Sequence, residues 1–231
     1  MKRLLRSTEE ENRRAVLAAL PTAPGAALLD LGTHDGCFTT RVAQRVGTSR
    51  VMGVELLPHH AAAARSRGID VREGDLNHSI PFPSDSYDLV NANQVIEHVQ
   101  RTDRMLAEIR RVLRPGGLAC ISTNNLASLH NLASLALGWQ PMPAHVSDDV
   151  IVGNPANPEK GQGHEDAGRT HLRLFTARAL TELCEYHGLR AVSMRTVGFY
   201  PFPPWAAKLV NRVDPLHGAF LVGVFERPGS S

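Results

Sequence analysis

Residues 28–36 read LLDLGTHDG, an apolar run that ends in a carboxylate and continues into a turn marked by glycines. The run from Ala26 to Leu31 is typical of a short buried strand, and a helical stretch follows from about Phe38 to Val46. A strand, a glycine-containing turn and a helix in this order indicate a nucleotide-type cofactor site.

Two glycine patterns compete at this turn. The dinucleotide pattern G-x-G-x-x-G, begun at Gly32, places His34 and Cys37 where glycines belong, so one position of three matches. The pattern [D/E]-x-G-x-G-x-G, begun at Asp30, matches at Asp30, Gly32 and Gly36 and fails at His34. A pyrophosphate needs backbone very close to a helix N-terminus, so the second pattern favours a cofactor without phosphates.

Strands and helices alternate along the rest of the chain. The apolar patterns predict further strands at 50–57, 69–73, 87–92, 118–123, 189–197 and 219–226, and helices at 8–20, 59–67, 104–113, 126–137 and 176–187. This alternation predicts an α/β fold with a doubly wound, mostly parallel seven-stranded sheet and helices on both faces. Ligands bind such sheets at the carboxyl ends of the strands.

The alternation divides the chain into four parts. Residues 1–24 form a helical lead-in, 25–123 the cofactor-binding half, and 176–231 a helix and strands that complete the sheet. Residues 124–175 follow the fifth strand and are rich in Gly, Pro, Asn, His and Asp. We interpret them as an insertion that covers the substrate, with a neutral surface loop as the alternative.

Composition excludes several classes of protein. The net charge of +2 equals the excess in the first fourteen residues, so no broad basic surface favours nucleic acid. No apolar run reaches the length of a membrane span, and no signal peptide is indicated. The three cysteines are far apart and suggest neither a disulfide framework nor a zinc site. We therefore expect a cytoplasmic protein.

Two more carboxylates follow predicted strands. Glu55 ends the second strand, where an acid can accept hydrogen bonds from both ribose hydroxyls in either class of nucleotide enzyme. Asp75 follows the third strand, where it can accept from an adenine amino group.

With these residues in place, the chain resembles a known family. The series DLGTHDG, VMGVELLP, EGDLNHSIPFPSDSYDLV, NANQVIEHV and EIRRVLRPGGLACIST is similar to the class I S-adenosylmethionine-dependent methyltransferases that act on small molecules. The resemblance runs from about Ala26 to Thr123. The stretch HLRLFT at 171–176 resembles members that tailor glycans and natural products.

The resemblance implies S-adenosylmethionine as the cofactor and a role for each motif. The methionine end would lie at Asp30, Gly32 and Gly36, the ribose at Glu55 and Leu56, the adenine at Asp75 and Leu76, and the floor beneath the sulfonium at Asn91, Ala92, Asn93 and Gln94. His34 replaces the usual central glycine. Its side chain either narrows the cofactor site or contacts the substrate, or it turns to solvent, and the sequence leaves these possibilities open.

The acceptor side is less defined. A general base is needed only for some acceptors, and the candidates are His98, His145, His164, Glu165, Asp166 and His171. We favour His164 and His171 as catalytic residues because they flank the return of the insertion to the sheet, although a purely structural histidine is the alternative for each. Apolar pocket walls are expected from Trp139, Phe199, Tyr200, Phe202 and Trp205.

Gln94, Glu97 and His98 form a Gln-x-x-Glu-His series. It resembles the Glu-x-x-Glu-His cluster of metal-dependent methyltransferases that act on catechol-type quinone precursors or small-RNA ends. The glutamine removes one charge from a site for a hard cation, so we assign no metal ligand.

The sequence thus predicts methyl transfer to an oxygen or nitrogen atom of a small molecule, such as a sugar or a natural-product intermediate. The alternatives are a metal-assisted catechol-type O-methyltransferase, an RNA or protein methyltransferase, a dinucleotide-dependent oxidoreductase and a non-catalytic, cofactor-binding partner protein. Acceptor identity and oligomeric state are not encoded in any motif we find.

Overall fold

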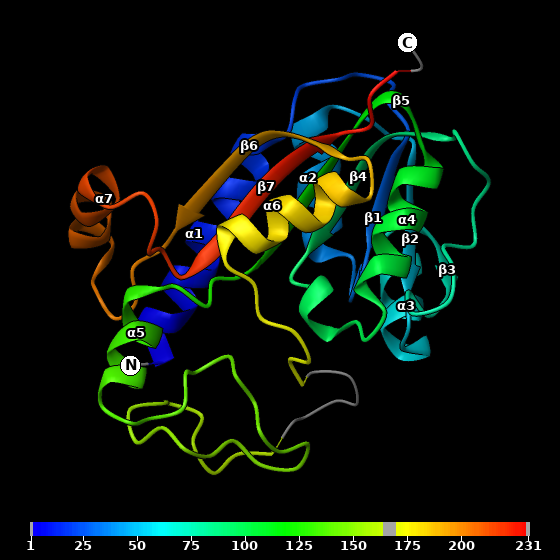
Figure 1. Cartoon of the computed structure of the whole chain (residues 1–231). Helices are drawn as coiled ribbons and strands as arrows, with labels where there is room; N and C mark the ends of the chain where they lie inside the picture. Colours follow the sequence, from blue (N-terminus) through cyan, green and yellow to red (C-terminus); the bar gives the residue numbers. More distant parts are fainter. Residues whose placement is uncertain (1, 164–169, 230–231) are drawn as a thin grey trace.

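The computed structural model describes residues 2–163 and 170–229 of the chain. Its described residues form a seven-stranded sheet in the order β3-β2-β1-β4-β5-β7-β6 (Figure 1). β7 runs antiparallel to both of its neighbours, and the core of the sheet is parallel. The strands are β1 (Leu28–Leu31), β2 (Val51–Glu55), β3 (Asp70–Glu73), β4 (Tyr87–Asn93), β5 (Leu113–Asn124), β6 (Arg190–Val197) and β7 (Phe220–Glu226). The predicted fold class is confirmed.

Helices cover both faces of this sheet (Figure 1). They are α1 (Lys2–Ala19), α2 (Cys37–Val46), α3 (Pro58–Ser66), η1 (Ile96–His98), α4 (Thr102–Val112), α5 (Leu129–Ala136), α6 (Ala177–Tyr186) and α7 (Pro204–Val213). The Thr176 hydroxyl accepts a hydrogen bond from the Ala179 amide and so caps α6, as the sequence predicts.

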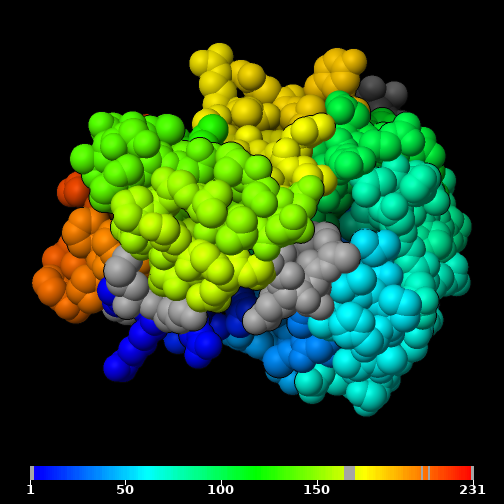
Figure 2. Space-filling view, turned by 90° about the horizontal axis from the view of Figure 1, so that it is seen from below, coloured from blue at the N-terminus to red at the C-terminus, as the bar shows by residue number. Residues whose placement is uncertain are grey.

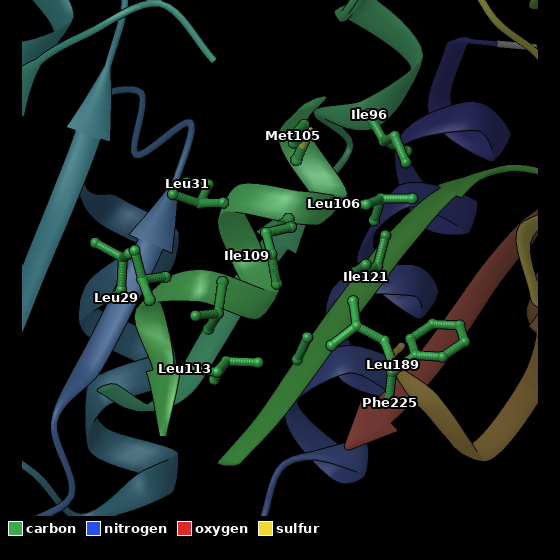
Figure 3. Packing of buried hydrophobic residues seen from close by; sticks show 14 of the residues in the cluster. Leu29, Leu31, Ile96, Met105, Leu106, Ile109, Leu113, Ile121, Leu189 and Phe225 are labelled. Carbon is green, nitrogen blue, oxygen red and sulfur yellow. The ribbon is translucent and has the colours of Figure 1, made fainter. Parts of the chain in front are cut away.

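The hydrophobic core lies in two layers on opposite faces of the sheet. On one face, Met105, Leu106 and Ile109 of α4 point toward β1 and β5 (Figure 3), and all three are fully buried. On the other face, Val16 of α1 and Val42 of α2 pack in a second buried cluster. Burial of each such side chain stabilises the fold by roughly 1.5–3 kcal/mol, which holds the strand ends at fixed positions.

Some boundaries differ from the prediction. We expect Pro115-Gly116-Gly117 to separate a helix from a strand that begins at Leu118, but β5 begins at Leu113 and runs through all three residues. The pairing of β4 with β5 shifts register between Tyr87 and Leu89, so the extra residues are accommodated as an irregularity of the strand. The helix α7 is not predicted at all.

The segment from residue 138 to 163 has neither helix nor strand and lies at the end of the sheet where the parallel strands finish (Figure 1). Figure 2 shows it spread over this end of the molecule. It is held by its own hydrogen bonds: the Gln140 amide donates to the Gly153 carbonyl at 2.9 Å, and Asn154 Nδ2 donates to the Gln140 carbonyl at 2.8 Å. Such bonding defines the conformation of a long loop.

Within the described residues, we find no helix with the length and apolar character that a membrane crossing requires.

Candidate functional site

A cavity of about 790 Å³ opens at the carboxyl ends of the parallel strands. Its walls include the turns after β1, β2 and β3, the end of β4 with η1, residues of α1, α2 and α5, and the segment between α5 and α6. Among the predicted cofactor residues, those that line it are Asp30, Gly32, His34, Glu55, Leu56, Asp75, Leu76, Asn93 and Gln94. The topology therefore brings these residues, which are far apart in sequence, to one site.

Asp30 is one of two buried acids that line this cavity, the other being Glu55. Its carboxylate accepts hydrogen bonds from the Thr39 hydroxyl and, at 2.7 Å, from Asn91 Nδ2. Burial raises the pKa of Asp30 to about 6, although those hydrogen bonds oppose the rise, and the charge of Glu55 adds to it. A buried carboxylate of this kind is stabilised in its ionised form by a cationic ligand.

Glycines shape the turn after Asp30. Gly32 has φ +70°, and a Cβ there would lie 2.7 Å from a methyl group of Val95. Gly36 has φ +80°, is the N-cap residue just before α2, and would place a Cβ 2.7 Å from Ile69. Gly36 is itself buried and is not among the lining residues. Both positions therefore require glycine for conformation and space.

His34 adopts the left-handed conformation, with φ 49°, at the position where the family pattern has glycine. Its backbone amide donates to Glu55 Oε2 at 2.8 Å, and its ring centroid lies 3.7 Å from that of His60. The side chain is half exposed and lines the cavity. The ring thus borders both the site and solvent and packs at an interplanar angle of 33° against a second imidazole.

Glu55 and Asp75 are both held in position by local hydrogen bonds. The Leu57 amide donates to Glu55 Oε1 at 3.0 Å, and the Asn77 amide donates to Asp75 Oδ1 at 2.8 Å. Burial alone would raise the pKa of Asp75, but hydrogen bonds from Asn77 and the nearby His78 outweigh it and keep the pKa below its ordinary value. Each carboxylate oxygen has more than one acceptor site, so both acids retain capacity for a ligand.

The end of β4 divides into two pairs. Asn91 and Ala92 are buried in the strand and are not among the residues that line the cavity, and Asn91 supports Asp30 instead. Asn93 and Gln94 do line it, and Asn12 Nδ2 of α1 donates to Asn93 Oδ1 at 2.9 Å. Of the four residues predicted to form the floor beneath the sulfonium, Asn93 and Gln94 therefore line the cavity, and Asn91 and Ala92 do not.

Three further histidines that line the cavity lie close together. The rings of His98 and His171 lie 4.9 Å apart, and His145 stacks on His171 at 4.7 Å with an interplanar angle of 7°. All three line the cavity. The segment after α5 contributes His145 and His171, and η1 contributes His98, so the fold joins two regions separated by more than forty residues.

Glu97 lies behind these histidines. Its carboxylate accepts from the Thr123 hydroxyl at 2.9 Å and from Asn124 Nδ2 at 3.4 Å. Its backbone carbonyl accepts from the Leu172 amide at 2.7 Å. Burial raises the pKa of Glu97 to about 7, against the hydrogen bonds that favour its ionised form. This residue therefore ties the returning segment to η1.

Other residues of the cavity have no clear signal in the sequence. His130 of α5 lines the wall beside Tyr200, with ring centroids 5.5 Å apart, and burial lowers its pKa to about 4. Thr8, Asn12 and neighbouring residues of α1 also line it. The sequences of α5, a helix of small residues, and of the N-terminal α1 contain no motif that would identify these residues as part of a binding site.

The remaining predictions concern three further candidate bases and five aromatic residues expected to line the pocket. His164, Glu165 and Asp166 lie outside the described residues. Of the five aromatic residues expected as walls, Tyr200 lines the cavity, Phe199 is buried in the core, Phe202 and Trp205 are exposed, and Trp139 is not among the lining residues.

Comparison with known proteins gives consistent results. A family described as "Methyltransferase domain" matches residues 4–194. A malonyl-[acyl-carrier protein] O-methyltransferase of Methylococcus capsulatus is 29% identical over 53% of this chain and 45% of its own length. The chain spans less than half the length of each of the first curated relatives it matches.

Two solved structures share the fold. A possible histamine N-methyltransferase of Thermotoga maritima superposes with a TM-score of 0.64 at 19% identity, over 97% of this chain and 91% of that one. Phosphoethanolamine N-methyltransferase 2 of Haemonchus contortus, solved with S-adenosyl-L-methionine, gives 0.60 at 18% identity, over 94% and 52%.

The chain therefore belongs to the methyltransferase-domain family, and the cofactor implied by this membership is S-adenosylmethionine. The residues fit such a ligand. Gly32 lines the cavity without a side chain, and Asp30, Glu55 and Asp75 bring three carboxylates to successive strand ends. Acceptor groups placed this way suit an ammonium group, ribose hydroxyls and an adenine amino group.

Proposed function

We propose that this protein transfers a methyl group from S-adenosylmethionine to an oxygen or nitrogen atom of a small-molecule acceptor. The observation that carries the proposal is the continuity of the cavity, in which three strand-end carboxylates and three histidines line one space. We call the part of the lining with Asp30, Glu55 and Asp75 the cofactor wall, and the part with His98, His145 and His171 the acceptor wall. A cofactor bound at the cofactor wall and an acceptor bound at the acceptor wall would be adjacent.

On the cofactor wall, Asp30 would hold the ammonium group, Glu55 with Leu56 the ribose, and Asp75 with Leu76 the adenine. Asp30 suits the ammonium group because its carboxylate is buried. Its hydrogen-bond donors, Thr39 and Asn91, are both uncharged, so they do not neutralise its negative charge. When bound, S-adenosylmethionine supplies a methyl carbon whose bond to sulfur breaks as the acceptor forms its new bond, the electron pair staying on sulfur.

On the acceptor wall, His171 is our candidate for the residue that promotes loss of the acceptor's proton. His171 is positioned from both sides: its Nδ1 donates to the Pro143 carbonyl at 2.9 Å, and its amide donates to His145 Nδ1 at 3.2 Å. A carbonyl can only accept, so the neutral ring carries its proton on Nδ1. Such fixed orientation is what catalysis by proximity requires.

A small acceptor is favoured by the number of elements that line this cavity. The segment from residue 138 to 163 and α1 both contribute to the lining, through residues such as Met142, Ile151 and Thr8. Walls on several sides limit the size of an acceptor that can reach the cofactor, and a bound acceptor would displace water from the reacting atoms. The balanced charge of the chain gives no support to a nucleic-acid acceptor.

The test has two stages. Isothermal titration calorimetry with S-adenosylhomocysteine should give micromolar or tighter binding, and NAD should give none. Micromolar binding of NAD without binding of S-adenosylhomocysteine would overturn the proposal. Incubation with S-adenosylmethionine and a panel of hydroxylated and amino small molecules, followed by release of S-adenosylhomocysteine, should then identify an acceptor.

Glu73→Gln is a matched control for the acids of the cofactor wall. Glu73 lies two residues before Asp75, forms an ion pair with Arg65 at 3.1 Å, and is exposed. Its substitution should leave affinity for S-adenosylhomocysteine within about twofold, because an exposed ion pair contributes little.

A further inference from the structure

The acceptor wall holds a group of side chains with the arrangement of a metal site. One carboxylate oxygen of Glu97 and one ring nitrogen each of His98 and His171 all lie within 4.8 Å of one another. This set brings one acid and two imidazoles together from η1 and from the far end of the segment after α5.

The orientation of the two rings provides an independent observation. His98 Nδ1 donates to the Thr170 carbonyl at 3.2 Å, and His171 Nδ1 donates to the Pro143 carbonyl at 2.9 Å. Backbone carbonyls accept and never donate, so in each neutral ring Nδ1 carries the proton and Nε2 carries the lone pair. Histidines that ligate metals commonly use this arrangement, with the second nitrogen bonded to a carbonyl.

His145 has the opposite arrangement. Its Nδ1 accepts a hydrogen bond from the His171 amide at 3.2 Å, which places the proton of the neutral ring on Nε2. His145 therefore stacks on His171 and supports it, while in His98 and His171 the hydrogen bond to a carbonyl places the lone pair of the neutral ring on Nε2. The three histidines are thus not equivalent, and their hydrogen bonds select the same two that join Glu97.

The carboxylate is oriented as well. Thr123 and Asn124 donate to different oxygens of Glu97, and both donors are uncharged. The Leu172 amide bonds to the Glu97 carbonyl, so the residue after His171 is fixed to the residue before His98. Support of this kind places all three side chains without any contribution from an ion.

We propose that Glu97, His98 and His171 bind one divalent transition-metal ion, Zn²⁺ or a close analogue, with an open coordination position toward the cavity. Two imidazoles and one carboxylate form a known set for zinc that leaves a position for water or substrate. Imidazole ligands favour zinc and its neighbours over Mg²⁺ or Ca²⁺, which prefer oxygen. His98 and His171 line the cavity, so the open position faces the acceptor.

The ion gives the acceptor wall a specific chemical role, and this part of the inference rests on the proposed methyl transfer. A hydroxyl group bound at the open position has a lowered pKa and releases its proton to solvent. In the metal-bound protein, His171 then acts as a neutral ligand, and the favoured acceptor is a small molecule with a hydroxyl group that can reach the ion.

The test begins with binding of the metal alone. The tag-free protein, stripped with a chelator, is titrated with ZnCl₂ by calorimetry, and Co²⁺ is added separately to record visible absorption bands. We expect one equivalent of Zn²⁺ and a Co²⁺ spectrum typical of nitrogen and oxygen ligands. Absence of binding would overturn the inference.

Variants locate the site. His98→Gln and His171→Gln should each weaken Zn²⁺ binding by at least about tenfold, and Glu97→Gln should do the same if it folds. His60→Gln is the matched control, because His60 belongs to the separate histidine group beside His34 and also lines the cavity. Unchanged affinity in both His98→Gln and His171→Gln, or loss in His60→Gln alone, would contradict the assignment.

The metal and the reaction can fail separately. If methyl transfer persists undiminished in chelator and Zn²⁺ does not bind, the proposed metal site is overturned and the proposed function still stands. Specific Zn²⁺ binding by a protein that does not bind S-adenosylhomocysteine would leave the ion and remove the proposed function.

Discussion

The two walls of the cavity are built in different ways. The cofactor wall consists of short turns that follow β1, β2 and β3, and each of its acids lies at or just after a strand end. The acceptor wall draws its side chains from η1, α5 and an irregular segment. Sheet topology brings the acids of the first wall together, and short-range hydrogen bonds orient them. Hydrogen bonds between segments distant in sequence join the second wall, so the two should respond differently to substitution.

The largest expected effect is on the acceptor wall. His171→Ala should lower turnover by about 100-fold or more, because it removes the residue that we propose promotes loss of the acceptor's proton. Steady-state assay of S-adenosylhomocysteine release measures it. His187→Ala is the control, since His187 pairs with Asp103 at 2.9 Å and is not among the lining residues. Equal turnover in the two variants would contradict the assignment of His171 to the reaction.

On the cofactor wall, Glu55→Gln should weaken S-adenosylhomocysteine binding by about 10- to 100-fold. The substitution removes hydrogen bonds from a charged acceptor, each of which contributes roughly 1.5–3 kcal/mol. It also disturbs the bond from the His34 amide. Calorimetry beside Glu73→Gln checks the result, and comparable losses in the two variants would mean that the effect is not specific to the strand end.

The pH dependence of cofactor binding tests Asp30. Its pKa is about 6, and an ammonium group prefers the ionised form. Affinity for S-adenosylhomocysteine should therefore fall as pH drops below 6, by about tenfold for each pH unit. The free protein should show the opposite trend: a carboxyl with a raised pKa makes folding stability fall as pH rises from about 4 to about 6.

Asp30→Asn should remove both trends. Binding measured by calorimetry between pH 5 and 7.5, and unfolding followed by denaturant over the same range, provide the data. A wild-type affinity that is flat through pH 6 would show that Asp30 does not hold the ammonium group.

The smallest effect concerns His34. A side chain with φ 49° carries a strain that glycine avoids, so His34→Gly should be more stable than His34→Ala by about 1 kcal/mol. Both variants lose the ring contact with His60, so the comparison isolates the backbone. Urea unfolding measures the difference. Equal stability would indicate that the turn does not keep its left-handed conformation.

These differences also explain what the sequence could predict. Asp30, Glu55 and Asp75 follow strands whose apolar pattern is visible in the chain, so their meeting at one edge follows from parallel topology. Asn91 has the same kind of position but supports Asp30 from within the strand, a detail that depends on which way one side chain points.

The acceptor wall was predictable in part. His171 and His98 are recognisable as candidates, but their proximity depends on the Leu172–Glu97 hydrogen bond, which no periodicity encodes. His130 and the lining residues of α1 come from elements whose sequence reflects helix packing alone. The irregular start of β5 was missed because Pro115-Gly116-Gly117 is usually a terminator.

We propose that one wall of the cavity binds the cofactor and that the other serves the acceptor. The sharpest test is titration of S-adenosylhomocysteine into the wild type, Asp75→Ala and His171→Ala. We predict that Asp75→Ala weakens binding by about tenfold, through loss of a hydrogen bond to the adenine, and that His171→Ala leaves it within about twofold. Equal loss of affinity in the two variants would contradict the division of the cavity into two walls.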